Sequence, residues 1–134
     1  MKRLSMLAIM LLCTAAAAKD GPESLREVDT FSQAEMYTHW IENRCIGRLD
    51  YGKTLTDDAY KSAAAWLQFG NLPIEAYNDG DAVIDRYLKV KLSGSVPGTF
   101  RVLQCTLIAA SPDVKRLYSK YEAMARKMGA KPWP

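Results

Sequence analysis

Apolar residues recur at every third or fourth position through most of this chain, the spacing that gathers them on one face of an α-helix. Glycines, prolines and short polar runs divide the pattern into separate segments. The alternation of apolar and polar residues that is typical of a half-buried strand is missing, apart from residues 87–92, which fit either structure. The sequence therefore predicts an all-α fold, a compact bundle of about five helices.

Capping residues mark the bounds of the first two predicted helices. Ser32 and Glu35 have the spacing of a capping box, so the first helix begins there. Gly52 follows its last apolar positions and ends it. We expect Thr56 to be the N-cap of the second helix and Gly70 to end that helix.

The remaining helices follow breaks in the pattern. We expect a short turn at 72–77, a break at Asn78-Asp79-Gly80 and a third helix over 81–91. A fourth helix over 99–110 is apolar on nearly all sides, which predicts a central and buried position. The fifth helix begins at Ser111-Pro112-Asp113, because an N-cap, a proline and an acidic residue suit a first turn in that order.

The first 18 residues have the layout of a secretory signal peptide. A positively charged start is followed by an apolar run and then by four alanines that end at Ala18. The run is shorter than the roughly 20 residues that a membrane-spanning helix needs. We expect residues 1–18 to be removed on export. Residues 19–30 would then form a flexible N-terminal arm, and residues 31–134 a single helical domain.

The net charge of the chain bears on its partners. The sequence contains 18 Lys and Arg residues and 15 Asp and Glu residues, a formal net charge of +3. Lys2 and Arg3 belong to the signal peptide, so the exported chain is nearly neutral. A nearly neutral chain lacks the basic surface that nucleic-acid binding requires. Removal of the signal also takes away the one long apolar run, so we expect no membrane insertion afterwards.

Two cysteines, Cys45 and Cys105, remain once the signal with Cys13 is removed. Two cysteines allow one intramolecular pairing, and the oxidising environment of an exported protein favours that disulfide. The alternative is a pair of buried free thiols. Lipidation of Cys13 would instead tether the chain to a membrane.

The ionisable residues provide few routes to catalysis. His39 is the only histidine, so a multi-histidine metal site is impossible. It is six residues from Cys45 on one helix, and side chains at that spacing do not share a face. We expect His39 on the solvent side of its helix. No phosphate-binding or dinucleotide-binding glycine motif is present. We therefore predict no enzyme activity, no metal and no cofactor.

Two pairs of carboxylates could still suggest a hydrolase. Asp57 with Asp58 fits a helix start, and Asp79 with Asp81 fits a turn followed by a helix start. Either pair could be half of a glycosidase-like dyad. A wall-acting enzyme that uses Asp57 or Asp79 is therefore the catalytic alternative.

The segment Ser93-Gly94-Ser95-Val96-Pro97-Gly98 contains two glycines, a proline and two serines, which exclude regular secondary structure. Exposed irregular segments on a rigid scaffold often carry recognition, and Pro97 would limit the entropy lost on docking. The alternative is a plain connector between two helices.

Taken together, the order of these motifs resembles the immunity proteins that protect bacteria from cell-wall amidases delivered by type VI secretion. A first cysteine follows Trp40-Ile41-Glu42-Asn43-Arg44, and an alanine-rich helix then carries Trp66. A helix ending in Tyr87-Leu88 comes next, and the second cysteine follows a variable loop in Phe100-Arg101-Val102-Leu103-Gln104-Cys105. The resemblance covers roughly residues 31 to 126.

This resemblance implies a periplasmic, all-helical homodimer in which Cys45 is joined to Cys105. Its partner would be a papain-like peptidoglycan amidase with a Cys-His pair, in a complex of two immunity chains and two amidase chains. Inhibition would occur by occlusion, because a protruding loop enters the substrate cleft. The segment that matches this loop consists of Ser93, Gly94, Ser95, Val96 and Pro97. A non-enzymatic envelope adaptor or structural protein is the alternative from another class.

Overall fold

The structure, a computed structural model, describes residues 24–129, which form five α-helices and one 3-10 helix without any strand. The 3-10 helix η1 spans Ser24–Thr30, and the α-helices are α1 Gln33–Ile46, α2 Lys53–Phe69, α3 Ile74–Leu88, α4 Arg101–Ala109 and α5 Pro112–Lys127. The predicted all-α bundle of about five helices is confirmed. The predicted signal peptide and residues 19–23 of the predicted arm lie outside the described residues. Residues 24–30 of that arm form η1.

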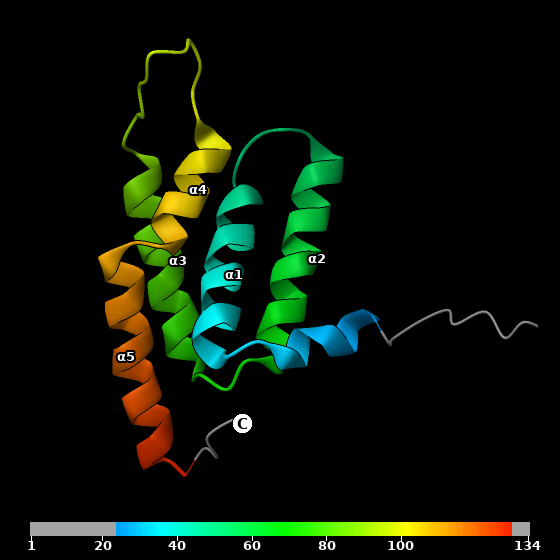
Figure 1. Cartoon of the computed structure of the whole chain (residues 1–134), viewed down its shortest axis with the longest axis vertical. Coiled ribbons are helices and arrows are strands. Elements are labelled where there is room, and N and C mark those ends of the chain that lie inside the picture. Colours follow the sequence, from blue (N-terminus) through cyan, green and yellow to red (C-terminus); the bar gives the residue numbers. More distant parts are fainter. Residues whose placement is uncertain (1–23, 130–134) are drawn as a thin grey trace, which may run out of the picture.

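Helix α1 is the centre of the bundle and contacts every other α-helix (Figure 1). Helix α2 lies antiparallel to α1 on one side, and η1 packs against α2. Helices α3, α4 and α5 cover the other side of α1, with α5 packed mainly on α3. Helix α1 thus lies in the middle of the bundle, with α2 on one side and α3, α4 and α5 on the other.

The core consists mainly of the inward faces of α1, α3, α4 and α5, and Ala63 of α2 also belongs to it. Met36, Tyr37 and Ile41 of α1 are almost fully buried, and the spacing of four residues places Tyr37 and Ile41 on one helix face. The Tyr37 hydroxyl donates a hydrogen bond of 2.6 Å to the Ala76 carbonyl oxygen. Burial raises the pKa of the Tyr37 hydroxyl, so this group stays a donor at any ordinary pH.

The predicted N-caps of α1 and α5 are confirmed. Ser32 and Glu35 form the complete capping box, with the Ser32 backbone N–H donating to the Glu35 carboxylate at 2.8 Å. Ser111 accepts a hydrogen bond from the Val114 backbone N–H, and Pro112 is in the first turn. These bonds satisfy N–H groups that helix starts otherwise leave unpaired.

Several predicted helix bounds are wrong. Helix α3 spans Ile74–Leu88 instead of 81–91, so it includes most of the predicted turn at 72–77. Helix α1 ends at Ile46, not near Gly52, because the next residues turn inward and bury Leu49. Helix α2 begins at Lys53, one turn before the predicted start at Thr56. The Thr56 backbone N–H donates to the Gly52 carbonyl oxygen, so Thr56 already belongs to the helix.

The predicted break at Asn78-Asp79-Gly80 does not occur, since α3 runs through it without interruption. Gly80 is buried where α3 meets α1. A Cβ atom there would lie 2.8 Å from Ile41 and 2.9 Å from Trp40, so the glycine allows a close approach of the two helices. Asp79 accepts a 2.6 Å hydrogen bond from the Tyr121 hydroxyl of α5. Packing from both sides thus overrides the low helix propensity of these residues.

Helix α4 is not buried on all sides as predicted. Gln104, Cys105 and Ile108 face the core, but Val102, Leu103 and Leu107 are 48%, 50% and 52% exposed. The helix lies at the edge of the bundle, where only one of its faces has neighbours. It therefore leaves an apolar face open to solvent.

The predicted disulfide between Cys45 and Cys105 is confirmed, with their Cα atoms 5.5 Å apart. It joins the last turn of α1 to the middle of α4, and both residues are fully buried. The chain-entropy model gives about 4 kcal/mol of stabilisation for closing a loop of this length. The bond therefore holds α4 against the central helix.

Replacing Gly80 with alanine should destabilise the bundle by about 1–3 kcal/mol, because the new methyl group would overlap packed atoms of α1. Urea unfolding followed by circular dichroism measures this. Asn78→Ala is the matched control, because Asn78 is exposed two residues earlier in the same helix. Equal stability of the Gly80→Ala variant and the native chain would contradict the close approach of α1 and α3.

Candidate functional site

The segment between α3 and α4 is the longest irregular connection among the described residues. It spans residues 89–100 and protrudes beyond the helices at one end of the bundle (Figure 1). The predicted site residues Ser93, Gly94, Ser95, Val96 and Pro97 lie next to one another in it, and all are exposed. The Val96 side chain is 64% exposed, although it is apolar.

Two side chains of α4 hold the base of this loop. The buried Gln104 amide donates hydrogen bonds of 2.8 Å to the Tyr87 carbonyl oxygen and 2.7 Å to the Val90 carbonyl oxygen. Arg101 donates bonds of 3.1 Å to the Leu88 carbonyl oxygen and to the Gln104 side chain. Carbonyl groups at a helix end lack partners within the helix, so α4 caps the C-terminus of α3.

The two sides of the loop also contact each other, at Gly94 and Phe100. A Cβ atom on Gly94 would lie 3.2 Å from the Phe100 ring, so the glycine backbone rests against the aromatic face. Phe100 has a left-handed backbone conformation with φ of 48°, which is unusual for a residue other than glycine. The tip is thus a narrow projection between two fixed ends.

Gln104 and Arg101 were not predicted as functional residues. The signal that could have indicated Gln104 is its position beside Cys105, because a polar residue in an otherwise apolar buried stretch requires hydrogen-bond partners. Those partners are the carbonyl oxygens of Tyr87 and Val90, and they cannot be identified without the fold.

The two pairs of candidate carboxylates are on different helices, and Asp57, Asp79 and Asp81 have structural partners. Asp57 pairs with Lys53 in the first turn of α2. On α3, Asp81 pairs with Arg44 at 2.9 Å, and hydrogen bonds from Tyr121 and Lys120 lower the pKa of Asp79. A lowered pKa favours the charged form and opposes a role as general acid.

His39 differs from its predicted solvent-facing position. Its ring stacks on Trp66 at 4.6 Å and meets the edge of Phe31 at 5.5 Å, so it is only half-exposed. Within residues 24–129 there is no group of three His, Cys, Asp or Glu side chains placed to hold a metal ion.

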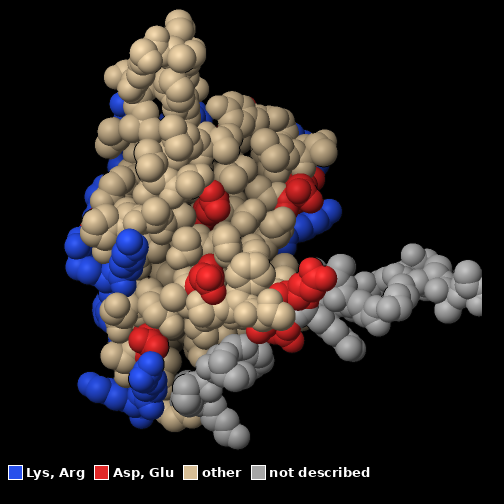
Figure 2. Space-filling model, viewed as in Figure 1, with Lys and Arg blue, Asp and Glu red and all other residues tan. Residues whose placement is uncertain are grey.

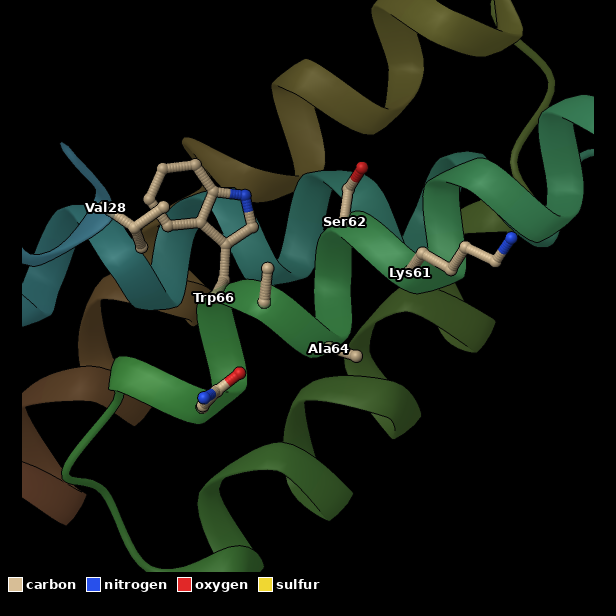
Figure 3. A pocket seen from close by; sticks show the side chains of 7 residues that line it. Val28, Lys61, Ser62, Ala64 and Trp66 are labelled. Atoms are coloured by element: carbon tan, nitrogen blue, oxygen red, sulfur yellow. The ribbon is translucent and has the colours of Figure 1, made fainter. Parts of the chain in front are cut away.

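A shallow groove on the outer face of α2 is lined by side chains of that helix and by Val28 of η1 (Figure 3). Trp66 points toward Val28, while Lys61 and Ser62 lie farther along α2 (Figure 3). Lys61 is the single ionisable side chain of this lining. The groove therefore does not bring together a proton donor and a proton acceptor.

A family model described as type VI secretion system amidase immunity protein, Tai4, matches residues 35–118. The chain belongs to this family. It is therefore an immunity protein and not an enzyme, and the resemblance found in its motifs is confirmed. The matched residues include the disulfide, the loop and its base.

Solved structures agree with this assignment. The chain is 42% identical to a chain of the Tae4-Tai4 effector-immunity complex from Enterobacter cloacae, with a TM-score of 0.67 over 75% of this chain and 99% of that one. It is equally similar, at 42% identity and a TM-score of 0.65, to a chain in the complex of Salmonella typhimurium Tae4 with Enterobacter cloacae Tai4, over 74% of this chain and 98% of that one.

A third structure, from work on type VI-secreted toxins and self-resistance proteins of Serratia marcescens, is 17% identical with a TM-score of 0.68, over 76% of this chain and 84% of that one. At that identity it shows the fold alone. No curated protein sequence matches the chain. Among the described residues, no helix is long and apolar enough to cross a membrane.

Replacing Gln104 with alanine should loosen the base of the loop, because two carbonyl groups lose their donor. We expect a loss of about 1–3 kcal/mol in the free energy of unfolding and faster amide hydrogen exchange around residues 88–100. Hydrogen-exchange mass spectrometry measures the second effect. Gln68→Ala, at an exposed position of α2, is the control. Unchanged exchange in the loop would show that Gln104 does not hold it.

Proposed function

We propose that this immunity protein is a periplasmic inhibitor of a Tae4-type effector, a papain-like peptidoglycan amidase. It binds the enzyme and inserts residues 93–97 into the active-site cleft, so that substrate cannot enter. This protects the cell and its siblings from the amidase. The proposal is supported by the two solved effector-immunity complexes that contain a chain 42% identical to this one.

The observation that carries the proposal is the exposed loop held by Gln104 and Arg101. A projection with fixed ends loses little conformational entropy on docking, so more of the contact energy remains for affinity. Residues 92–100 carry no charged side chain, so insertion does not require the desolvation of a charge. The serines and glycines are small enough for a narrow cleft, and Val96 supplies apolar surface at its tip.

A periplasmic location is supported by the predicted signal peptide and by the buried disulfide. Disulfides form and persist in oxidising compartments such as the periplasm and are rare in the bacterial cytoplasm. The disulfide also holds α4, from which Gln104 reaches the loop base. Export and the shape of the inhibitory loop would therefore be linked, because oxidation stabilises the helix that supports the loop.

Replacing Val96 with aspartate should weaken binding to the amidase by about 2–4 kcal/mol, because it buries an uncompensated charge in the cleft. Calorimetric titration of the chain purified from the periplasm into a Tae4 amidase measures this. Ile74→Asp is the matched control, because Ile74 is similarly exposed, at 59%, but begins α3 at the opposite end of that helix from the loop. Tight binding by the Val96→Asp variant would exclude loop insertion.

We further propose that the inhibitor is a homodimer that binds two amidase chains. The support is the open apolar face of α4, where Val102, Leu103 and Leu107 are each about half exposed. These positions share one side of the helix, opposite Cys105 and Ile108. Two copies that bury this face against each other would remove apolar surface from water, which is a common basis for symmetric dimers.

Replacing Leu103 with aspartate should convert the dimer to a monomer without unfolding it, since the side chain is exposed within the single chain. Light scattering coupled to size exclusion measures the mass. Met124→Asp, at an exposed position of α5, should leave the dimer intact. A monomeric native chain, or a dimer that survives Leu103→Asp, would contradict the assignment of this face.

A further inference from the structure

The nearly neutral net charge hides a separation of charge along the chain. Residues 24–85 contain 11 acidic and 5 basic residues, whereas residues 86–129 contain 2 acidic and 9 basic residues. Such asymmetry between two parts of one domain indicates a surface field that the net charge does not reveal.

The fold keeps these two parts on different sides of the molecule. The acidic part forms η1, α1, α2 and most of α3, and the basic part forms the end of α3, the loop, α4 and α5. In Figure 2, Lys and Arg side chains gather along the flank of α5, while most visible Asp and Glu side chains lie toward α1, α2 and η1. The molecule therefore has a positively charged flank that runs along α5.

Four of these cations lie on the α3 side of the loop, and we name them the basic collar: Lys89 and Lys91 at the start of the loop, Arg86 in the last turn of α3, and Arg116 of α5. Lys89 and Lys91 are exposed, and neither has a carboxylate partner among residues 24–129. Arg86 and Arg116 share a single carboxylate, that of Asp113, which also accepts a 3.0 Å hydrogen bond from the Tyr87 hydroxyl.

The collar therefore carries an excess of positive charge. Asp113 is its one acidic neighbour in these contacts, and no acidic residue occurs between Asp85 and Asp113 in the sequence. Arg86 and Arg116 are 63% and 71% exposed, so most of their guanidinium donors face solvent. Arg101 adds a further charge, but its donors already bind the Leu88 carbonyl oxygen and Gln104.

We propose that the basic collar contacts a carboxylate-rich rim around the cleft of the amidase and steers the two proteins together. This inference rests on the proposed function and adds a second contact to it. A surface that accepts residues 93–97 must also come close to Lys89 and Lys91, because these two exposed lysines immediately precede that segment in the same loop. Residues 92–100 carry no charge and supply no long-range attraction, whereas the collar acts over a Debye length of about 10 Å at moderate salt.

A second copy of this chain does not fit the collar in a symmetric dimer. The same face would meet itself, and the excess cations would repel each other. The open face of α4, which carries no charge at Val102, Leu103 or Leu107, does not have this conflict. The collar therefore remains available to a partner with a negatively charged surface.

The test compares association rates of the amidase with the native chain and with the double variant Lys89→Glu/Lys91→Glu, measured by stopped flow. At low salt we expect the variant to associate at least about tenfold more slowly, and at high salt we expect the difference to disappear. The dissociation rate should change little, in contrast to Val96→Asp, which should act mainly on dissociation.

The control is Lys61→Glu/Lys127→Glu, which changes the net charge by the same amount on the outer face of α2 and at the end of α5. It should associate within about twofold of the native rate, since neither position borders the loop. An equal slowing of both variants would mean that only total charge matters, and an unchanged rate for Lys89→Glu/Lys91→Glu would exclude the collar as a contact. Either result overturns the proposal.

An anionic membrane is the other surface to which the collar could bind. Vesicles of phosphatidylcholine and phosphatidylglycerol test for that binding. Binding to these vesicles that the Lys89→Glu/Lys91→Glu variant loses, with an unchanged association rate for the amidase, would assign the collar to the membrane and overturn the proposal. If the native chain does not bind the amidase at all, the proposed function itself fails. The two failures are therefore distinguishable.

Discussion

The disulfide between Cys45 and Cys105 is the constraint on which the rest of this structure depends. It fixes the short helix α4, which has open solvent on one side, to the most buried part of α1. The residue before Cys105 is Gln104, whose amide binds the carbonyl groups of Tyr87 and Val90 at the end of α3. One covalent bond and its neighbouring side chain thus connect the hydrophobic core to the loop, and the core positions the loop through them.

Much of the fold could be predicted from the sequence, because the features that define it are local. The capping residues Ser32 and Ser111 mark their helices through contacts three residues away, and two cysteines leave one pairing. The continuity of α3 through Gly80 could not be predicted, since it depends on Trp40 and Ile41 of another helix. The open face of α4 was missed for a related reason, because an apolar stretch does not show how many neighbours its helix will have.

The candidate site could also be predicted only in part from the sequence. The composition of residues 93–98 predicted an exposed loop, and the structure places it as a projection at one end of the bundle. What supports the loop could not be predicted, because the bonds of Gln104 and Arg101 join residues 13 to 17 positions apart. The two arginines that share Asp113 come from α3 and α5, so their proximity also follows only from the fold.

The exposure of every side chain from Ser93 to Thr99 has a consequence for how such a protein changes over time. Apart from Gly94, which packs against Phe100, these residues can be exchanged with little effect on stability, since large losses come from cores and caps. The lineage can therefore sample new loop sequences while the helices, the disulfide and Gln104 keep the same frame. Under the proposed function, the residues that recognise the amidase and the residues that maintain the fold are thus largely different ones.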